Sequence, residues 1–284
     1  MLKKIFFAAA LLLASELIAK PVVIASIAPV EYLAKAVGGD KIEVQSLAKG
    51  DVHSYEPKPN DMKAVAKARI FIAAGLEFEE AWIPRFKASA KNLVVVKSDA
   101  KIAKLKEERG EQAEHDEKHE AHADPHVWLN PMLAITMARN ISDALIDMDK
   151  ANKDFYLENF QKLMNDLLAF DESAKESLAG LKNRKFVVYH PAWGYFAAHY
   201  DLEQISIERS GKEPKIDEMA STLKMIKDEN IKVIFADPNR SQKSAQILAS
   251  QTGAKVELLD PLGYNILENL KIAVGAIKDA NSPK

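Results

Sequence analysis

Cysteine is absent from the 284 residues of this sequence. The chain therefore forms no disulfide bond and offers no thiolate to a metal ion. It also lacks the cysteine to which a bacterial lipoprotein attaches its lipid. We therefore expect a protein that is not lipidated.

A surplus of positive charge is also missing. Lys and Arg number 39 against 41 Asp and Glu, a formal net charge of -2, so we expect no nucleic-acid partner. After residue 20 no segment approaches about 18 consecutive apolar residues, which predicts no transmembrane helix in the mature chain. With 284 residues, 48% of them hydrophobic, the chain can bury the cores of two compact domains or of one large domain.

Residues 1–19 have the composition of a secretory signal. Lys3 and Lys4 precede an apolar run over residues 5–14, and Ala19 closes the segment. The run is too short to span a bilayer, and the order of charged, apolar and small residues is that of a cleaved signal. We predict a signal peptide over residues 1–19, cleavage near Ala19 and export to the periplasm.

Short β-branched segments alternate with amphipathic segments along the rest of the chain, which is typical of α/β folds with parallel strands. The predicted strands are residues 22–26, 41–47, 68–75, 92–96, 185–190, 204–208, 232–237 and 254–260. The predicted helices between them are residues 31–39, 59–68, 191–200, 218–230 and 241–253. The pattern predicts an N-terminal lobe (20–148) and a C-terminal lobe (182–284), each with a mostly parallel sheet flanked by helices.

One long helix is predicted between the two lobes. Asn130 and Pro131 favour the start of a helix that runs to about residue 148. Residues 149–181 then contain no proline, and no glycine before Gly180. The spacing of their apolar residues predicts about 30 residues of helix, roughly 45 Å long. We expect a rigid link, because flexible linkers are rich in Gly and Ser.

Residues 107–125 interrupt this pattern with a charged, acidic segment. We interpret it as a mobile loop of the first lobe. His115, His119 and His122 lie at spacings that would place them on one face of a helix. The segment is either an accessory metal site or a solvated tether.

Ligands of open α/β sheets bind beyond the carboxyl ends of the strands. The candidate residues at such positions are His53, His126, His190 and Asp260, two from each lobe, which predicts a site in the cleft between the lobes. Imidazole nitrogens with one carboxylate suit zinc in tetrahedral geometry. Their spacing matches no local metal motif, so each histidine on its own is equally compatible with a buried or surface residue that binds no metal.

The segments around these residues resemble the metal-binding solute-binding proteins of zinc and manganese ABC transporters. They are HSYEPKPND (53–61), DPHVWLNP (124–131), VVYHPAWGYFA (187–197) and LDPLG (259–263), and the similarity extends through residues 211–238. The resemblance implies two α/β lobes joined by one long helix, with metal ligands at His53, His126, His190 and Asp260. It also implies delivery of the metal to a membrane permease driven by a cytoplasmic ATPase. We expect a monomer without enzymatic activity.

The resemblance also favours zinc over manganese. Manganese-type members usually carry a carboxylate where this chain has His190, and zinc-type members carry a His-rich acidic loop like residues 111–126. Manganese prefers more oxygen ligands and a higher coordination number. The chain departs from the family pattern at Lys215, where a small hydroxyl residue is usual, and in the small number of histidines in its loop.

Other polar and aromatic residues stand beside the candidate ligands. Glu56 is open to three interpretations: a fourth ligand, an acceptor for a ligand histidine, or a helix-entry charge. Trp128, Trp193 and Tyr195 either wall the cleft against water or pack in the core. His199 is interpreted as a surface or packing residue. Glu208, Asp217 and Asp237 could each bond the second nitrogen of a histidine or cap a helix, and we favour capping.

Three other functions fit parts of the pattern. A manganese, iron or broad divalent-metal carrier would use the same cleft. A zinc metallohydrolase needs an open ligand position, and the HExxH motif is absent from the sequence. A surface adhesin of this fold is disfavoured because the chain lacks a lipid-acceptor cysteine.

Overall fold

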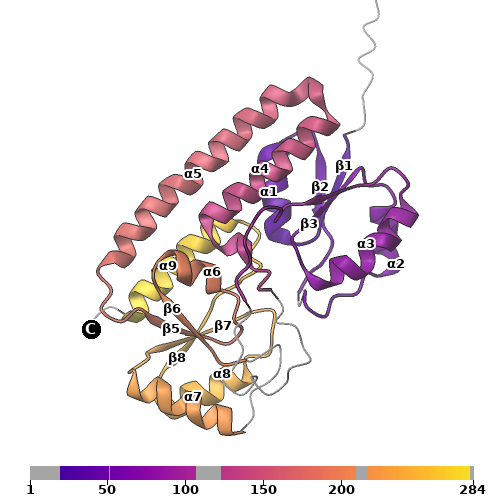
Figure 1. Cartoon of the computed structure of the whole chain (residues 1–284). Helices are drawn as coiled ribbons and strands as arrows, with labels where there is room; N and C mark the ends of the chain where they lie inside the picture. The colour runs from indigo at the N-terminus through magenta and orange to yellow at the C-terminus, as the bar shows by residue number, and fades with distance from the viewer. Residues whose placement is uncertain (1–19, 51, 107–122, 209–215, 282–284) are drawn as a thin grey trace, which may run out of the picture.

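The computed structural model describes residues 20–50, 52–106, 123–208 and 216–281. In these ranges the chain forms two α/β lobes, each built on a four-stranded parallel sheet (Figure 1). The predicted signal peptide and the loop residues His115, His119 and His122 lie outside the described residues. Among the described residues, no helix combines the length and hydropathy that a bilayer span requires.

The first sheet has the strand order β2-β1-β3-β4. Its strands are β1 (Val22–Ala25), β2 (Glu43–Ser46), β3 (Ile70–Ala73) and β4 (Val94–Lys97), connected through α1 (Ala28–Gly38), α2 (Pro59–Val65) and α3 (Glu77–Ser89). All four residues of β3 are buried, whereas the edge strands β2 and β4 are partly exposed. A parallel sheet covered by helices on both faces requires such apolar central strands.

The second sheet repeats this arrangement with the order β6-β5-β7-β8. Its strands are β5 (Lys185–Val188), β6 (Glu203–Ser206), β7 (Val233–Ala236) and β8 (Lys255–Leu258), with helices α6 (Gly194–His199), α7 (Ile216–Asp228), α8 (Lys243–Thr252) and α9 (Ile266–Asn281). In each sheet the second strand along the chain pairs with one side of the first strand, and the third strand pairs with its other side. The carboxyl edge at this reversal is the usual ligand position in open α/β sheets.

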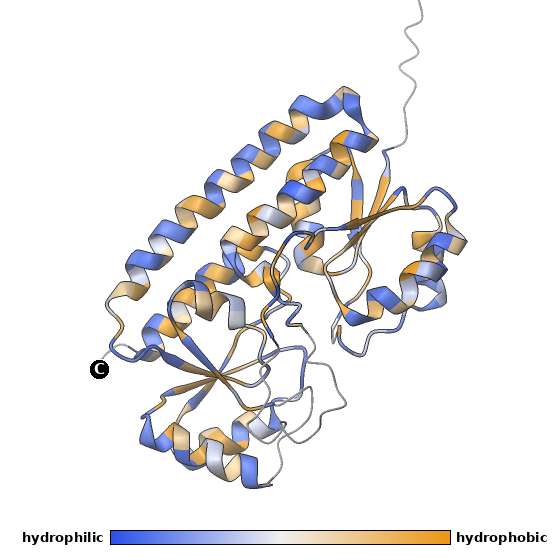
Figure 2. Ribbon diagram, in the orientation of Figure 1, coloured by the Kyte–Doolittle hydropathy of each residue, from blue (hydrophilic) through white to orange (hydrophobic). Residues whose placement is uncertain are grey.

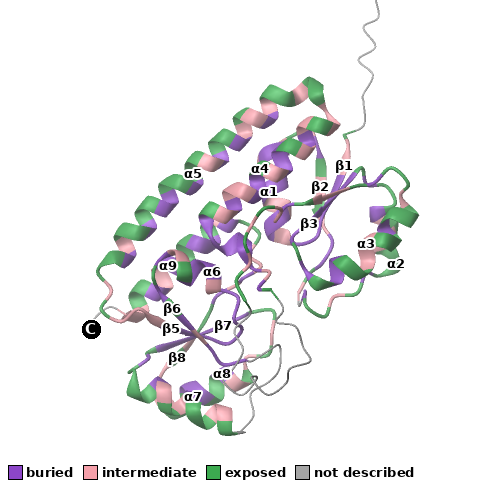
Figure 3. Cartoon of the chain, in the orientation of Figure 1, coloured by how far each residue is buried: buried purple, intermediate pink, exposed green. Residues whose placement is uncertain are grey.

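The long helix between the lobes is confirmed. Helix α4 (Pro131–Met148) begins where Asn130 Oδ1 accepts hydrogen bonds from the amides of Met132 and Leu133, at 2.9 and 3.2 Å. A 3₁₀ turn, η3 (Lys150–Asn152), then reverses the chain into the 27-residue helix α5 (Lys153–Ala179). Helix α5 runs along the side of both lobes and packs against α1, α4 and α9 (Figure 1). Its buried residues form one stripe, and its outer face is exposed (Figure 3).

The lobes share one continuous apolar core. Buried side chains extend from the first sheet through α4 and α5 to α6 and α9 in the second lobe. A second, smaller core lies between the other face of the second sheet and helices α7 and α8. Apolar residues accordingly dominate the strands and the inward helix faces (Figure 2). Since the shared core resists separation of the lobes, it favours limited lobe movement.

Helices α3 and α9 are absent from the sequence-based prediction. Pro84 lies inside α3, and an internal proline normally argues against a helix. Helix α9 does carry a helical signal, because its buried residues recur every three or four positions: Ile266, Leu270, Ala273, Val274 and Ile277. The helix predicted over residues 191–200 is shorter in the structure, where α6 begins at Gly194.

Candidate metal centre

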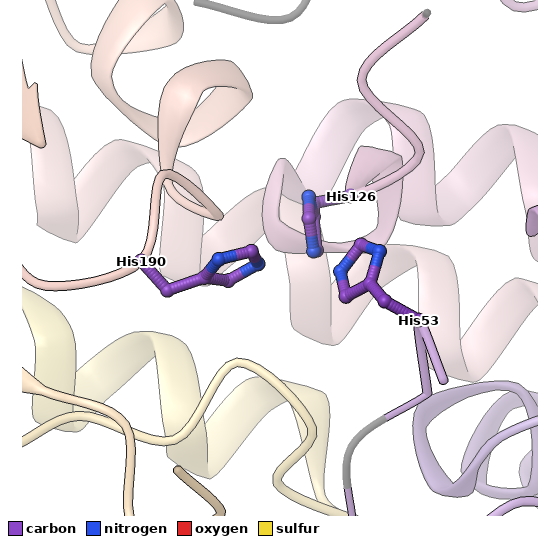
Figure 4. Close-up of side chains that lie close together, drawn as sticks. All are labelled: His53, His126 and His190. Atoms are coloured by element: carbon purple, nitrogen blue, oxygen red, sulfur yellow. The ribbon is translucent and has the colours of Figure 1, made fainter. Parts of the chain in front are cut away.

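Three histidines from distant parts of the sequence meet between the lobes (Figure 4). His53 follows β2, and His126 immediately precedes the 3₁₀ helix η2 (Val127–Leu129), both in the first lobe. His190 stands two residues after β5 in the second lobe. The loops beyond the carboxyl ends of one strand from each sheet therefore bring histidines to one place, where ligands bind in open α/β sheets.

The three imidazoles are close enough to share one ion. Ring centroids lie 5.4 Å apart for His53 and His126, 5.0 Å for His53 and His190, and 5.2 Å for His126 and His190. One nitrogen from each ring lies within 4.8 Å of the others. His126 and His190 are only 4% and 7% exposed, whereas His53 is exposed. The group is therefore buried on two sides and reached from solvent on the side of His53.

The space beside the histidines is small. It measures about 10 Å³, close to the volume of one water-sized sphere. The residues around it are Gly50, Val52, His53, His126, His190, Asp237, Arg240, Pro261 and Leu262. A space of this size suits a single ion and excludes a larger solute.

Asp124 orients the ring of His126. Its Oδ1 accepts hydrogen bonds from the backbone amide of His126 at 2.9 Å and from ring Nδ1 at 2.8 Å. A carboxylate only accepts, so Nδ1 carries the proton and Nε2 keeps its lone pair for a metal. Asp124 is itself 6% exposed, which makes this contact a buried one.

His190 is held in the neutral form. Burial lowers its pKa well below the ordinary value of 6.5, and nearby His126, Arg240 and His53 lower it further. Its Nδ1 lies 3.3 Å from Glu208 Oε2, without the geometry of a hydrogen bond. Neither ring nitrogen has a hydrogen-bond partner among the described residues. A metal ion bound to one of these buried nitrogens would supply a partner that the described residues do not.

Asp260, the predicted carboxylate ligand, is not in the histidine group. Its Oδ1 accepts hydrogen bonds from Asn239 Nδ2 at 3.0 Å and from the amide of Leu262 at 2.8 Å. The described residues that could share one ion within 4.8 Å are the three histidines alone. Asp260 as a ligand therefore stays a prediction, and so does Glu56, which is exposed and does not line the small space.

Trp128 ties the two lobes together beside the site. Its ring lies 5.3 Å from that of His126, and its Nε1 donates to the carbonyl of Pro261 at 2.7 Å. Trp128 is fully buried, so the side chain both packs in the core and covers one side of the centre. Its packing in the core is thus shown, and a role in excluding water from the cleft stays a prediction.

Tyr195 supports the segment that carries His126. Its hydroxyl donates to the carbonyl of Asp124 at 2.8 Å and accepts from the amide of Leu105 at 2.8 Å. Trp193, in contrast, packs against Phe196 in the core with ring centroids 5.7 Å apart. Only Tyr195 of this pair connects the second lobe to a ligand segment.

Four charged residues near the centre have contacts that the sequence did not establish. Asp124 had a local signal, since it stands two residues before His126 in DPH. Glu208 and Asp237 were expected to cap helices, but both lie against Arg240 instead. No sequence signal pointed to Arg240.

His199 is a packing residue, in line with its interpretation from the sequence. Its Nε2 lies 2.6 Å from Asp171 Oδ1 on α5, away from the three clustered histidines. It therefore serves as a reference histidine outside the centre.

The family model described as zinc-uptake complex component A, periplasmic (ZnuA), matches residues 23–279. A curated protein of Treponema pallidum is 34% identical over 243 residues, which cover 82% of this chain and 77% of the relative. The high-affinity zinc uptake system protein ZnuA of Bacillus subtilis is 30% identical over 279 residues, covering 91% and 86%.

A solved structure has the same fold. It is a deletion mutant of ZnuA with zinc bound, which is 34% identical, has a TM-score of 0.86 and covers 93% of this chain and 99% of its own. The family match runs from the first strand into the last helix, and it includes all three clustered histidines. The chain therefore belongs to the family of periplasmic zinc-uptake complex component A proteins.

Proposed function

We propose that the protein captures Zn²⁺ with His53, His126 and His190 and delivers it to a membrane import complex. The observation that carries this proposal is the convergence of three imidazoles from both lobes within 4.8 Å. Two of the rings are buried and one is exposed, an arrangement that lets an ion enter and then be held.

The donor set favours zinc. Imidazole nitrogens suit zinc, whereas manganese prefers oxygen ligands and more of them. A tetrahedral ion with bonds of about 2.0–2.1 Å holds its nitrogens about 3.3 Å apart, so modest rotation of the rings would close the group around it. A manganese or broad divalent-metal carrier is the alternative, and relative affinities distinguish the two.

The fourth ligand and the His-rich segment remain part of the proposal. Asp260 is our candidate for the fourth position, and an Asp260→Asn variant with unchanged zinc affinity would exclude it. We further propose an accessory site at His115, His119 and His122. Deletion of residues 107–122 should then reduce the zinc stoichiometry.

We also propose where the protein works and with what. Residues 1–19 would direct export and be removed near Ala19, leaving an unlipidated monomer in the periplasm. The loaded protein would dock on a permease driven by a cytoplasmic ATPase and act as a carrier, not as an enzyme. Mass spectrometry of the exported protein should find Lys20 at its N-terminus.

The decisive experiment is a competitive zinc titration with a chromogenic chelator. A triple variant, His53→Ala, His126→Ala and His190→Ala, should lose high-affinity binding, because no ligand of the cluster remains. A His199→Ala variant is the matched control and should bind like the wild type. If the triple variant kept the wild-type affinity, the cleft assignment would be wrong.

A further inference from the structure

Two carboxylates from the second sheet lie next to the metal centre. Glu208 follows β6, and its Oε2 lies 3.3 Å from His190 Nδ1. Asp237 directly follows β7 and lines the small space beside the histidines. Either carboxylate would be a suitable oxygen ligand for a divalent cation if it turned toward the ion.

Arg240 binds both of these carboxylates. Its Nη1 lies 3.0 Å from each oxygen of Glu208, and its Nε lies 3.7 Å from Asp237 Oδ2. The side chains of Arg240, Glu208 and Asp237 are 14%, 2% and 6% exposed. Asp237 Oδ1 also accepts the amide of Asn239 at 2.7 Å. The contact with Glu208 is a buried charge-assisted hydrogen bond, the stronger kind, whereas the contact with Asp237 is a longer ion pair.

The position of Arg240 gives it a second effect. Its side chain lines the same small space as the three histidines. The cation therefore neutralises carboxylates that would otherwise add negative charge and oxygen donors at the centre. The space is then faced from this side by the imidazole of His190 and by an Asp237 carboxylate whose charge Arg240 offsets.

We propose that Arg240 is a specificity-determining residue, which restrains Glu208, and with it Asp237, so that the ion meets nitrogen ligands and zinc is favoured over manganese. This inference rests on the proposed function, because it concerns the choice of metal at the same site. Oxygen donors and higher coordination numbers suit manganese, so a released carboxylate should improve manganese binding more than zinc binding.

The test compares the Kd values for Zn²⁺ and Mn²⁺ in wild type and in Arg240→Gln. We expect the manganese affinity of the variant to rise by about tenfold, the size usual for groups that support metal ligands, while zinc affinity changes by less than about threefold. The ratio is the relevant readout, because the loss of a nearby positive charge alone would favour both divalent ions equally. The cobalt-loaded variant should also show the weaker visible absorption of a higher coordination number.

A double variant, Arg240→Gln with Glu208→Gln, tests the route of the effect. With the carboxylate removed, the preference for zinc should return toward the wild-type ratio. Arg240→Lys keeps the charge but has no guanidinium to contact Glu208 and Asp237 through different nitrogens, so it should shift the ratio in the same direction as Gln. The Lys variant carries the test if the Gln variant does not fold.

The inference would be overturned if Arg240→Gln or Arg240→Lys kept the wild-type preference for zinc over manganese, measured as the ratio of their Kd values. It would also be overturned if a reduced preference for zinc persisted in the double variant. These outcomes differ from failure of the proposed function. In that case the wild-type protein itself would bind no zinc through its three histidines.

Discussion

Removal of the Asp124 carboxylate should weaken zinc binding without unfolding the protein. Asp124 Oδ1 accepts two hydrogen bonds from His126, one from the backbone and one from ring Nδ1. The second bond presents Nε2 to the ion and increases its basicity. In an Asp124→Ala variant the ring would lose this restraint, while the Tyr195 contact to the residue 124 carbonyl would remain.

The size of the effect follows from the contact. A hydrogen bond to a charged acceptor contributes about 1.5–3 kcal/mol, and Asp124 is buried, so solvent screening is small. Each 1.4 kcal/mol changes an affinity tenfold, which predicts a zinc Kd raised by about ten- to one hundred-fold. Asp124→Asn keeps an acceptor oxygen and the size of the side chain but loses the charge. Its effect should lie between those of wild type and Ala.

The assay is a zinc titration against a chelator at one fixed pH, beside urea unfolding of the metal-free proteins. Asp166, on α5 and away from the histidines, provides a control as Asp166→Ala, which should bind zinc like wild type. An Ala variant at position 124 that binds zinc within about twofold of wild type would refute the reasoning, because the restraint on His126 would then contribute nothing.

The pKa of His190 is lowered on folding, so below pH 6.5 the unfolded chain takes up a proton that the folded chain does not. The free energy of unfolding of the metal-free protein should therefore fall as the pH falls below that value, by up to about 1.4 kcal/mol per pH unit from this residue. Urea unfolding should show that the free energy of unfolding falls more in acid for wild type than for His190→Gln. Trp128→Phe leaves the Pro261 carbonyl without its donor and should lower the free energy of unfolding by about 1–3 kcal/mol in urea. Asn130→Ala removes the cap of α4 and should cost about 1 kcal/mol, measured in the same way.

Much of the fold could be predicted from the sequence because the patterns that indicate its helices and strands are local. The alternation of β-branched and amphipathic segments predicted all eight described strands within parallel sheets, and the long run without proline predicted α5. Asn130 and Pro131 predicted the start of α4 for a reason confined to one helical turn. Helix α3 was not predicted because Pro84 lies inside it, and burial of Phe78 and Phe86 on its inner face overrides this local preference.

The sequence by itself determined which types of side chain could act as ligands at the centre. A chain without cysteine offers no thiolate ligand, and the motifs around His53, His126 and His190 pointed to a shared site. No comparable sequence motif predicts the hydrogen bonds between the lobes, such as the one from Tyr195 to the carbonyl of Asp124.

Only the tertiary structure decided which of those residues meet. It brings the three histidines within 4.8 Å, engages Asp260 with Asn239 and Leu262, and sets Arg240 against Glu208. The physical reason is that distant contacts depend on how two sheets and α5 are packed. A local pattern determines the conformation of a segment, whereas the distance between side chains on different lobes is set by the shared core.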